Sequence, residues 1–295
     1  MAARSAKLGK EGGICVKIPA NYVEQLRKRA ADADNIMCLG LDPVLQRIPV
    51  QGKNSEERIV KFYTAILNAM VDEDVLPAIA KPNAAFYEQY GLEGLRALKA
   101  IIDAYKKVGI PILIDAKRGD IGDTSAAYAN AWFNWWGVDA ITVAPYMGFD
   151  SVQPFIAHCE NGKGAYLLVR TSNEGAKDFQ DLRTNNEPLY WHVAKKLLAW
   201  HKPGLGAVIG ATYPKELEQL SEFFVASGKA VPFLIPGVGK QGGSISEVVR
   251  ILRKTNNELA IHRINASSAI NYAYEKEKTD DFAGAAVKAL RAMIK

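Results

Sequence analysis

Short apolar runs alternate along this chain with longer segments of helical periodicity. A short apolar run bounded by turn residues is typical of a buried strand, whereas apolar residues spaced three and four apart predict an amphipathic helix. The runs that predict strands span residues 36–41, 78–81, 111–117, 140–144, 165–170, 206–210, 232–236 and 259–265. The segments that predict helices span residues 21–33, 55–74, 92–107, 124–136, 187–200, 215–226, 244–254 and 280–294.

The regular alternation of strands and helices predicts a parallel sheet with right-handed crossover connections. Eight such units within 295 residues match an α/β fold of the (β/α)8 TIM-barrel type, with a doubly wound open sheet as the alternative. We expect a single barrel domain over residues 21–295, preceded by a short N-terminal extension over residues 1–20. In such a barrel, functional side chains lie at the carboxyl ends of the strands, and phosphate binds after strands seven and eight.

Composition and charge narrow the class of protein. The chain is 48% hydrophobic and 23% charged, as in ordinary globular proteins. Its net charge of +5 comes from dispersed lysines and arginines, which suits a small anionic substrate rather than nucleic acid. No apolar run approaches the roughly 18 residues of a membrane span. Because Cys15, Cys38 and Cys159 are scattered and show no metal-ligand spacing, we expect a cytoplasmic protein without a cysteine metal site.

The segment 115–120 (DAKRGD) concentrates chemistry at the end of the third predicted strand. Strand residues alternate between faces, so Asp115 and Lys117 should point the same way, while Asp120 falls in the following turn. Neighbouring carboxylates favour the ammonium form of a lysine, which can then protonate a developing carbanion as a general acid. Asp115 could also repel an anionic substrate group until that group leaves, although stabilisation of the carbanion is the main effect that we expect.

Polar residues also follow most of the other predicted strands. Asp42 follows the first strand, Lys81 ends the second, and Thr171, Ser172 and Asn173 follow the fifth. Residues 237–243 (GVGKQGG), after the seventh strand, match the dinucleotide fingerprint G-x-G-x-x-G, but that fingerprint belongs to a different position in a βαβ unit. We interpret this segment as a phosphate-binding loop, because small residues let backbone N–H groups approach phosphate oxygens.

Taken together, these motifs resemble the orotidine 5′-monophosphate decarboxylases, in the subgroup that carries a Lys-Pro-Asn-Ala-Ala-Phe block. The resemblance implies conversion of orotidine 5′-monophosphate to uridine 5′-monophosphate (UMP) in pyrimidine biosynthesis, without a metal or an organic cofactor. The matching segments occur in the expected order at residues 39–43 (LGLDP), 81–86 (KPNAAF), 115–120, 144–148 (APYMG), 171–173 (TSN) and 236–243.

The resemblance also implies a role for individual residues. Lys117 matches the proton donor to C6 of the pyrimidine. Asp120, with Thr124 beside it, matches an acid that reaches into the neighbouring subunit, so that a homodimer would share its active sites. The family's charge network is matched by Lys81, Asp115, Lys117 and Asp120. The implied substrate contacts are Asp42 and Lys81 for the ribose hydroxyls, Ser172 for the pyrimidine edge and Gln241 for the phosphate.

One position departs from the family pattern. Ser268 stands where these enzymes normally carry a phosphate-binding arginine, and a serine cannot make charge-assisted bidentate contacts. Lys240 is the first candidate to supply the missing charge, and Arg263 is the second. Two other hypotheses stay open. One is a related magnesium-dependent decarboxylase of sugar-phosphate β-keto acids, and the other is a nucleotide-binding protein that has lost catalysis.

Overall fold

The computed structural model describes residues 21–239 and 242–294. The predicted N-terminal extension and the predicted phosphate contacts Lys240 and Gln241 therefore lie outside the described residues. Within the described ranges, no helix is both long and apolar enough to cross a membrane.

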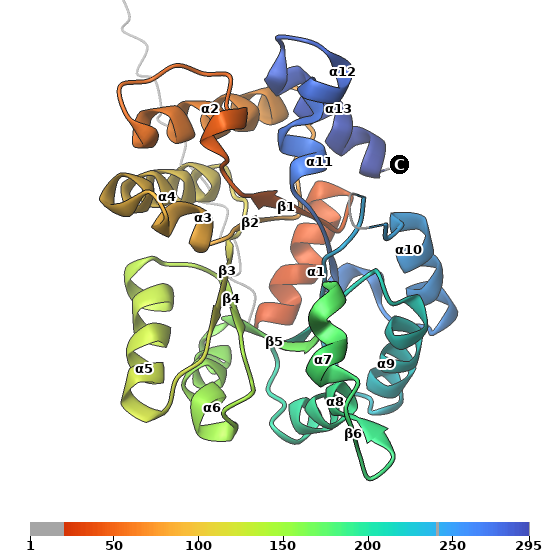
Figure 1. Cartoon of the computed structure of the whole chain (residues 1–295). Helices are drawn as coiled ribbons and strands as arrows, with labels where there is room; N and C mark the ends of the chain where they lie inside the picture. Colours follow the sequence, from red (N-terminus) through yellow and green to blue (C-terminus); the bar gives the residue numbers. More distant parts are fainter. Residues whose placement is uncertain (1–20, 240–241, 295) are drawn as a thin grey trace, which may run out of the picture.

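Eight parallel strands form a barrel that helices surround (Figure 1). The strands pair in the order β2-β1-β10-β9-β8-β5-β4-β3. Contacts between β2 and β3 bring the two ends of the sheet together, since the Ala80 N–H donates to the Pro111 carbonyl at 3.0 Å and Asn83 bridges to Asp115. The predicted barrel is thus confirmed. Its strands are β1 (Met37–Leu41), β2 (Ile79–Pro82), β3 (Leu113–Arg118), β4 (Ala140–Val143), β5 (Gly164–Arg170), β8 (Leu205–Ile209), β9 (Phe233–Ile235) and β10 (Arg263–Ala266).

The predicted helices form, with bounds that differ by a few residues. Four of them begin at a side-chain cap: Asn21, Asn54, Ser244 and Asp281 each accept a hydrogen bond from the backbone N–H of the residue three positions later. These helices are α1 (Tyr22–Ala33), α2 (Ser55–Asp72), α4 (Gly91–Lys107), α5 (Gly122–Asn130), α8 (Leu189–Ala199), α9 (Pro214–Ala226), α10 (Ile245–Lys254) and α13 (Phe282–Ile294).

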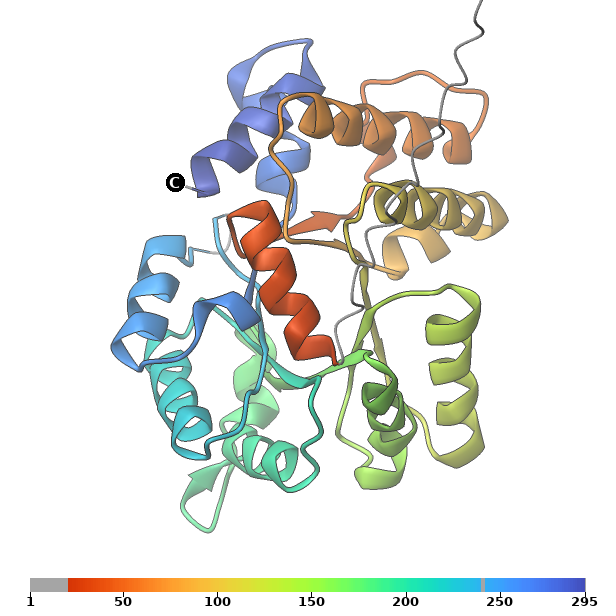
Figure 2. The same ribbon diagram turned by 180° about the vertical axis from the view of Figure 1, so that it is seen from behind.

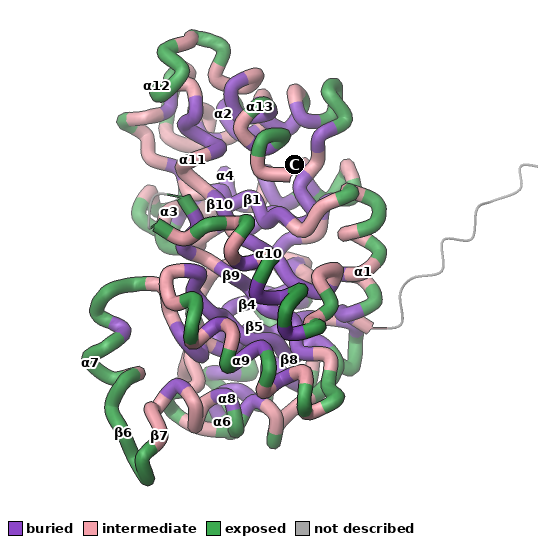
Figure 3. The backbone as a smooth tube through the Cα atoms, turned by 90° about the vertical axis from the view of Figure 1, so that its right-hand side faces the viewer, coloured by how far each residue is buried: buried purple, intermediate pink, exposed green. Residues whose placement is uncertain are grey.

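Several short elements were not predicted. The helix between β4 and β5 has nine residues and contains Pro154, which obscures its periodicity. A hairpin precedes α8, and together with α7 it projects from the end of the barrel opposite α1 (Figure 3). The additional helices and strands are α3 (Ala85–Glu88), α6 (Phe149–Ala157), α7 (Lys177–Gln180), β6 (Arg183–Thr184), β7 (Glu187–Pro188), α11 (Ser268–Asn271) and α12 (Ala273–Glu277). Single turns η1 (Leu45–Arg47), η3 (His158–Asn161), η4 (Glu174–Ala176) and η5 (Leu259–Ile261) also occur, and α5 continues as the π-helical turn η2 (Ala131–Trp135).

The last predicted strand is wrong over its first half. Residues Leu259–Ile261 form a 3₁₀ turn, and β10 begins only at Arg263. Both the turn and the strand bury apolar side chains, so the run looks continuous in the sequence. This shift places Arg263 at the amino end of its strand, away from any phosphate site at the carboxyl ends.

The amino ends of the strands are closed by α1, which lies across this end of the barrel (Figure 2). The side chains of Tyr22 and Leu26 from α1 pack on barrel-interior residues such as Tyr166 and Cys38. Arg263 is fully buried here, where it donates to the Leu26 carbonyl at 2.7 Å and to the Ala260 carbonyl at 3.0 Å. The prediction of Arg263 as a phosphate contact is therefore wrong, and this arginine instead ties α1 to the barrel.

Candidate active site

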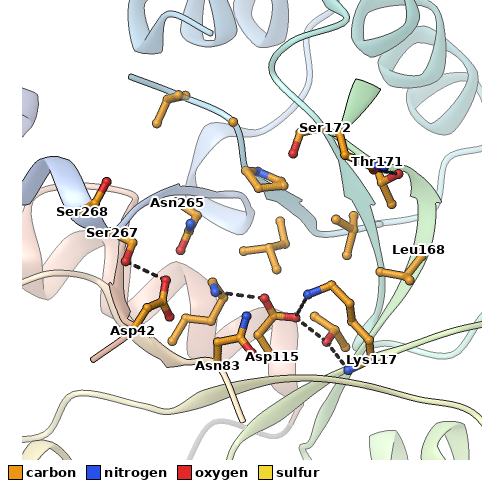
Figure 4. A pocket seen from close by; sticks show the side chains of 18 of the residues that line it. Asp42, Asn83, Asp115, Lys117, Leu168, Thr171, Ser172, Asn265, Ser267 and Ser268 are labelled. Carbon is orange, nitrogen blue, oxygen red and sulfur yellow. Dashed lines mark hydrogen bonds and ion pairs between the residues drawn. The ribbon is translucent and has the colours of Figure 1, made fainter. Parts of the chain in front are cut away.

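A cavity of about 690 Å³ opens at the carboxyl ends of the strands (Figure 4). Its floor is apolar and its walls are polar, which is typical of a site for a small polar molecule. The floor includes Leu168, Val208 and Leu234, and Pro236, Gly237, Val238 and Ala269 also line the cavity. The polar lining residues are Asp42, Lys81, Asn83, Asp115, Lys117, Thr142, Thr171, Ser172, Asn173, Gln180, Asn265, Ser267 and Ser268.

Asp115 lies at the centre of a charge network. Its Oδ2 is 3.1 Å from Lys81 Nζ, and its Oδ1 is 2.6 Å from Lys117 Nζ. The Thr142 hydroxyl donates a third bond, to Oδ1, at 2.9 Å. The network that the sequence predicted for Lys81, Asp115 and Lys117 is thus present within one chain.

The network holds its members in their charged forms. Burial by itself would raise the pKa of Asp115, but the ammonium groups of Lys81 and Lys117 outweigh burial and hold that pKa well below its usual range. Burial likewise opposes the charged form of Lys81, yet the carboxylates of Asp115 and Asp42 raise its pKa above the ordinary value. At neutral pH Lys81 and Asp115 therefore form a buried ion pair.

The backbone at Lys117 is strained. Its φ of 45° lies in the left-handed region, at an irregularity in the pairing of β3 with β4. The Lys117 N–H donates to the Thr142 hydroxyl at 3.0 Å, so one threonine holds both this backbone and the Asp115 carboxylate. Strain of this kind concentrates at functional sites, where the surrounding structure enforces it. Here it accompanies a Lys117 side chain that is about half exposed, at 49%, on the cavity wall.

Asp42 follows the end of β1 and lies across the cavity from Lys117. Its Oδ2 accepts a hydrogen bond from the Ser267 hydroxyl at 2.6 Å. Its Oδ1 is buried and has no hydrogen-bond partner among the described residues. The contact with Ser267 needs Gly40, because a Cβ at residue 40 would come within 2.6 Å of the Ser267 Cβ.

Two predicted site residues do not line the cavity of their own chain. The Asp120 carboxylate accepts a hydrogen bond from the Ile121 N–H at 2.8 Å, and Thr124 is exposed on α5. Exposed apolar side chains lie nearby in sequence, among them Ile121, and others such as Tyr146 follow β4. The prediction that Asp120 and Thr124 serve a second subunit stays a prediction.

Sequence reasoning assigned no role to several residues that line the cavity. Thr142 had a signal, since it is the one polar residue within the apolar strand β4. Asn83 lies within the Lys-Pro-Asn block but carried no assigned function. Gln180 could not be recognised in the sequence, because it ends the four-residue helix α7, whose position depends on tertiary contacts. The phosphate-loop interpretation is supported only at its start, where Gly237 and Val238 line the cavity.

Comparisons with known proteins agree with this geometry. A family model described as "Orotidine 5′-phosphate decarboxylase / HUMPS family" matches residues 37–279. A Herpetosiphon aurantiacus protein named orotidine 5′-phosphate decarboxylase is 41% identical over 276 residues, covering 92% of this chain and 96% of its own. The structure of Leishmania donovani OMP decarboxylase has a TM-score of 0.72 and 32% identity, covering 93% of this chain and 98% of its own. The structure of Leishmania donovani UMP synthase has a TM-score of 0.74 and 34% identity over 92% of this chain, which spans 56% of that longer protein.

Proposed function

The chain belongs to the orotidine 5′-phosphate decarboxylase / HUMPS family and decarboxylates orotidine 5′-monophosphate in pyrimidine biosynthesis, and we propose that Lys117 is its proton donor. In this mechanism the bond between C6 and the carboxylate breaks, and carbon dioxide leaves while the electron pair stays on C6. A proton from Lys117 Nζ then forms the new C6–H bond. The observation that carries the proposal is the Asp115 carboxylate held between Lys81 and Lys117 in one cavity.

The charges in the network account for the two parts of the chemistry. The Lys117 ammonium stabilises the negative charge that develops at C6, and it is the general acid that removes that charge. Asp115 keeps the Lys117 side chain in place, with Nζ and Oδ1 only 2.6 Å apart. Lys81 keeps Asp115 ionised from the other side, so the network needs no proton rearrangement before substrate binds.

The remaining cavity residues bind the nucleotide in this proposal. Asp42 and Lys81 contact the ribose hydroxyls, and the place of both residues in the cavity lining supports this assignment. Ser172 contacts the pyrimidine edge from the opposite wall. Gln241 and Lys240 bind the phosphate beside Ser268, with Lys240 in place of the arginine that the family pattern would put at residue 268.

We also propose a homodimer with shared active sites. Asp120 and Thr124 do not line the cavity of their own chain. Apolar side chains near them are exposed, Ile121 at 56% and Tyr146 at 87%, as expected of a surface that a second subunit covers. Mixing Asp120→Ala and Lys117→Ala dimers after reversible dissociation should then restore part of the activity, because one site in each hybrid carries neither defect. Hybrid dimers confirmed by mass that show no recovery would contradict the shared site.

The decisive experiment for the function is loss of orotate absorbance with orotidine 5′-monophosphate as substrate. We expect turnover that persists in EDTA. Loss of turnover in EDTA would instead favour the magnesium-dependent sugar-phosphate decarboxylases, and tight UMP binding without turnover would favour a nucleotide-binding protein. We further infer that residues 21–295 are the catalytic domain and that the enzyme works in the cytoplasm, as the free thiols of Cys38 and Cys159 suggest.

A further inference from the structure

A buried arginine lies beside the cavity without lining it. Arg170 ends β5 and is 1% exposed. Its Nη2 is 3.1 Å from Asp181 Oδ1, and its guanidinium carbon lies 3.9 Å from the centre of the Tyr213 ring. Burying a charged group is costly unless its partners compensate for the lost hydration. We therefore asked what Arg170 contributes at its position next to the cavity.

The first connection from Arg170 to the cavity runs through Gln180. The side-chain oxygen of Gln180 accepts a hydrogen bond from Arg170 Nη1 at 3.4 Å and another from the Thr171 N–H at 2.9 Å. The Gln180 amide nitrogen donates to the Thr171 hydroxyl at 2.7 Å. Because the guanidinium and the Thr171 N–H are both donors, together they set which way the Gln180 amide faces, and this orientation holds Thr171 at two atoms.

The second connection runs through Tyr213, at the end of the loop that follows β8. The Tyr213 hydroxyl donates to the Asn173 carbonyl at 3.1 Å, and the neighbouring Thr212 hydroxyl donates to the Ser172 carbonyl at 3.0 Å. Gly210 allows this approach, since a Cβ there would come within 2.7 Å of the Ser172 Cα. The segment 171–173 is therefore held from both sides, and Arg170 contacts the holding residue on each side.

We infer that Arg170 is a positioning residue that fixes the segment 171–173 against the cavity through Gln180 and Tyr213. The inference rests on the proposed function, in which Ser172 contacts the pyrimidine. A contact residue held in its bound geometry avoids the entropy cost of ordering when the ligand binds. Arg170 should therefore affect recognition of the base and leave recognition of the ribose phosphate unchanged.

The test compares two ligands that differ only in the base. UMP and ribose 5-phosphate are titrated calorimetrically into wild-type protein and the variants Arg170→Met and Arg170→Lys. We expect Arg170→Met to weaken UMP binding by about tenfold, or ~1.4 kcal/mol, and to leave ribose 5-phosphate binding unchanged. The affinity of Arg170→Lys for UMP should lie between those of the wild type and Arg170→Met, because an ammonium keeps the charge opposite Asp181 but lacks the guanidinium fork.

A second variant keeps the inference testable if Arg170→Met does not fold. Tyr213→Phe retains the ring over Arg170 and removes only the hydrogen bond to Asn173, so it should weaken UMP binding in the same selective way, by a smaller factor. Equal weakening of both ligands, or unchanged UMP binding in the folded variants, would overturn the positioning role.

The test of Arg170 can fail or succeed independently of the test of the proposed activity. Wild-type protein that binds UMP but does not turn over orotidine 5′-monophosphate would contradict the activity, while the variants would still decide the role of Arg170. Wild-type protein that fails to bind UMP would overturn both. In the turnover assay, Arg170→Met should raise KM by about tenfold with little change in kcat, because the base contact exists in ground and transition states alike.

Discussion

Each end of the barrel buries a cation, but the two cations have different partners. Lys81, at the carboxyl end, is 3% exposed and has the Asp115 carboxylate at 3.1 Å. Arg263, at the amino end, is fully buried, and its described hydrogen bonds all go to backbone carbonyls. Despite burial, carboxylates raise the pKa of Lys81, whereas burial lowers the pKa of Arg263.

The difference separates chemistry from stability. At the carboxyl end, charges of both signs face a cavity and can respond to a substrate, which is where TIM barrels place their active sites. At the amino end, the arginine satisfies carbonyls of α1 and of the segment before β10, and it does not line the cavity at the carboxyl end. Substitutions at the carboxyl end should therefore change turnover, and substitutions at the amino end should change the free energy of unfolding.

The largest expected effect comes from Lys117→Ala. It removes the proton donor and the charge that stabilises the carbanion, so kcat should fall by several powers of ten while the melting temperature stays near that of the wild type. Lys99→Ala, on the outer face of α4, is the matched control, because it removes a lysine paired with an aspartate far from the cavity. A Lys117→Ala enzyme that keeps more than about a tenth of kcat, a loss of only ~1.4 kcal/mol, would contradict the general-acid role.

At the opposite end, Arg263→Met should lower the free energy of unfolding by about 3 kcal/mol, because buried carbonyls lose their donors. Urea unfolding measures this change, and kcat under native conditions should stay within about twofold of wild type, since no contact with the reacting atoms is lost. A stable variant with reduced kcat would break the division between the two ends.

The phosphate side of the cavity allows a finer test. Ser268→Arg should raise kcat/KM and Lys240→Ala should lower it, each by about 1.5–3 kcal/mol, as for a hydrogen bond to a charged group. The two changes should be non-additive, because both act on one phosphate. The measurement is a double-mutant cycle on kcat/KM. Strict additivity, or a Lys240→Ala enzyme equal to wild type, would show that Lys240 has not replaced the arginine.

The last effect concerns acid stability at the amino end. His262 is fully buried; its Nδ1 accepts from the Phe233 N–H at 3.0 Å, so Nε2 carries the proton and donates to Asn257 at 2.8 Å. Burial and the Arg263 charge lower the pKa of His262 from 6.5 to about 3. Below pH 6.5 the unfolded chain binds a proton at His262, while the folded protein does not. As the pH is lowered from 6.5 to 3, the free energy of unfolding should therefore fall by about 1.4 kcal/mol per pH unit.

A matched variant isolates this contribution. His262→Gln cannot take up the proton, so its unfolding free energy, measured in urea between pH 7 and pH 4, should decline less steeply than that of the wild type. His158 and His201, whose pKa values burial also lowers, account for part of the slope that remains. Equal slopes for the two proteins would show that His262 does not contribute.

Local pattern was enough to predict most of the strands, most helices and the meeting of Asp115 with Lys117, whereas the place of Lys81 in the charge network came from the family resemblance. Apolar runs of strand length, turn residues and caps act over a few residues, so they can be recognised without knowing what packs against them. The alternation of side chains along a strand correctly predicted that Asp115 and Lys117 reach the same place. The alternation of strands and helices then left the barrel as the expected fold, and the carboxyl ends as its functional face.

Only the tertiary structure decided which residues meet across the barrel. Thr142 reaches Asp115 from a neighbouring strand, and Gln180 reaches Thr171 from the short helix α7, where it also contacts the buried Arg170. Arg263 shows the limit most clearly. The apolar run through residues 259–265 does not reveal that a turn ends and a strand begins within it. Because packing against the core sets that boundary, the chain alone could not tell at which end of the barrel Arg263 would lie.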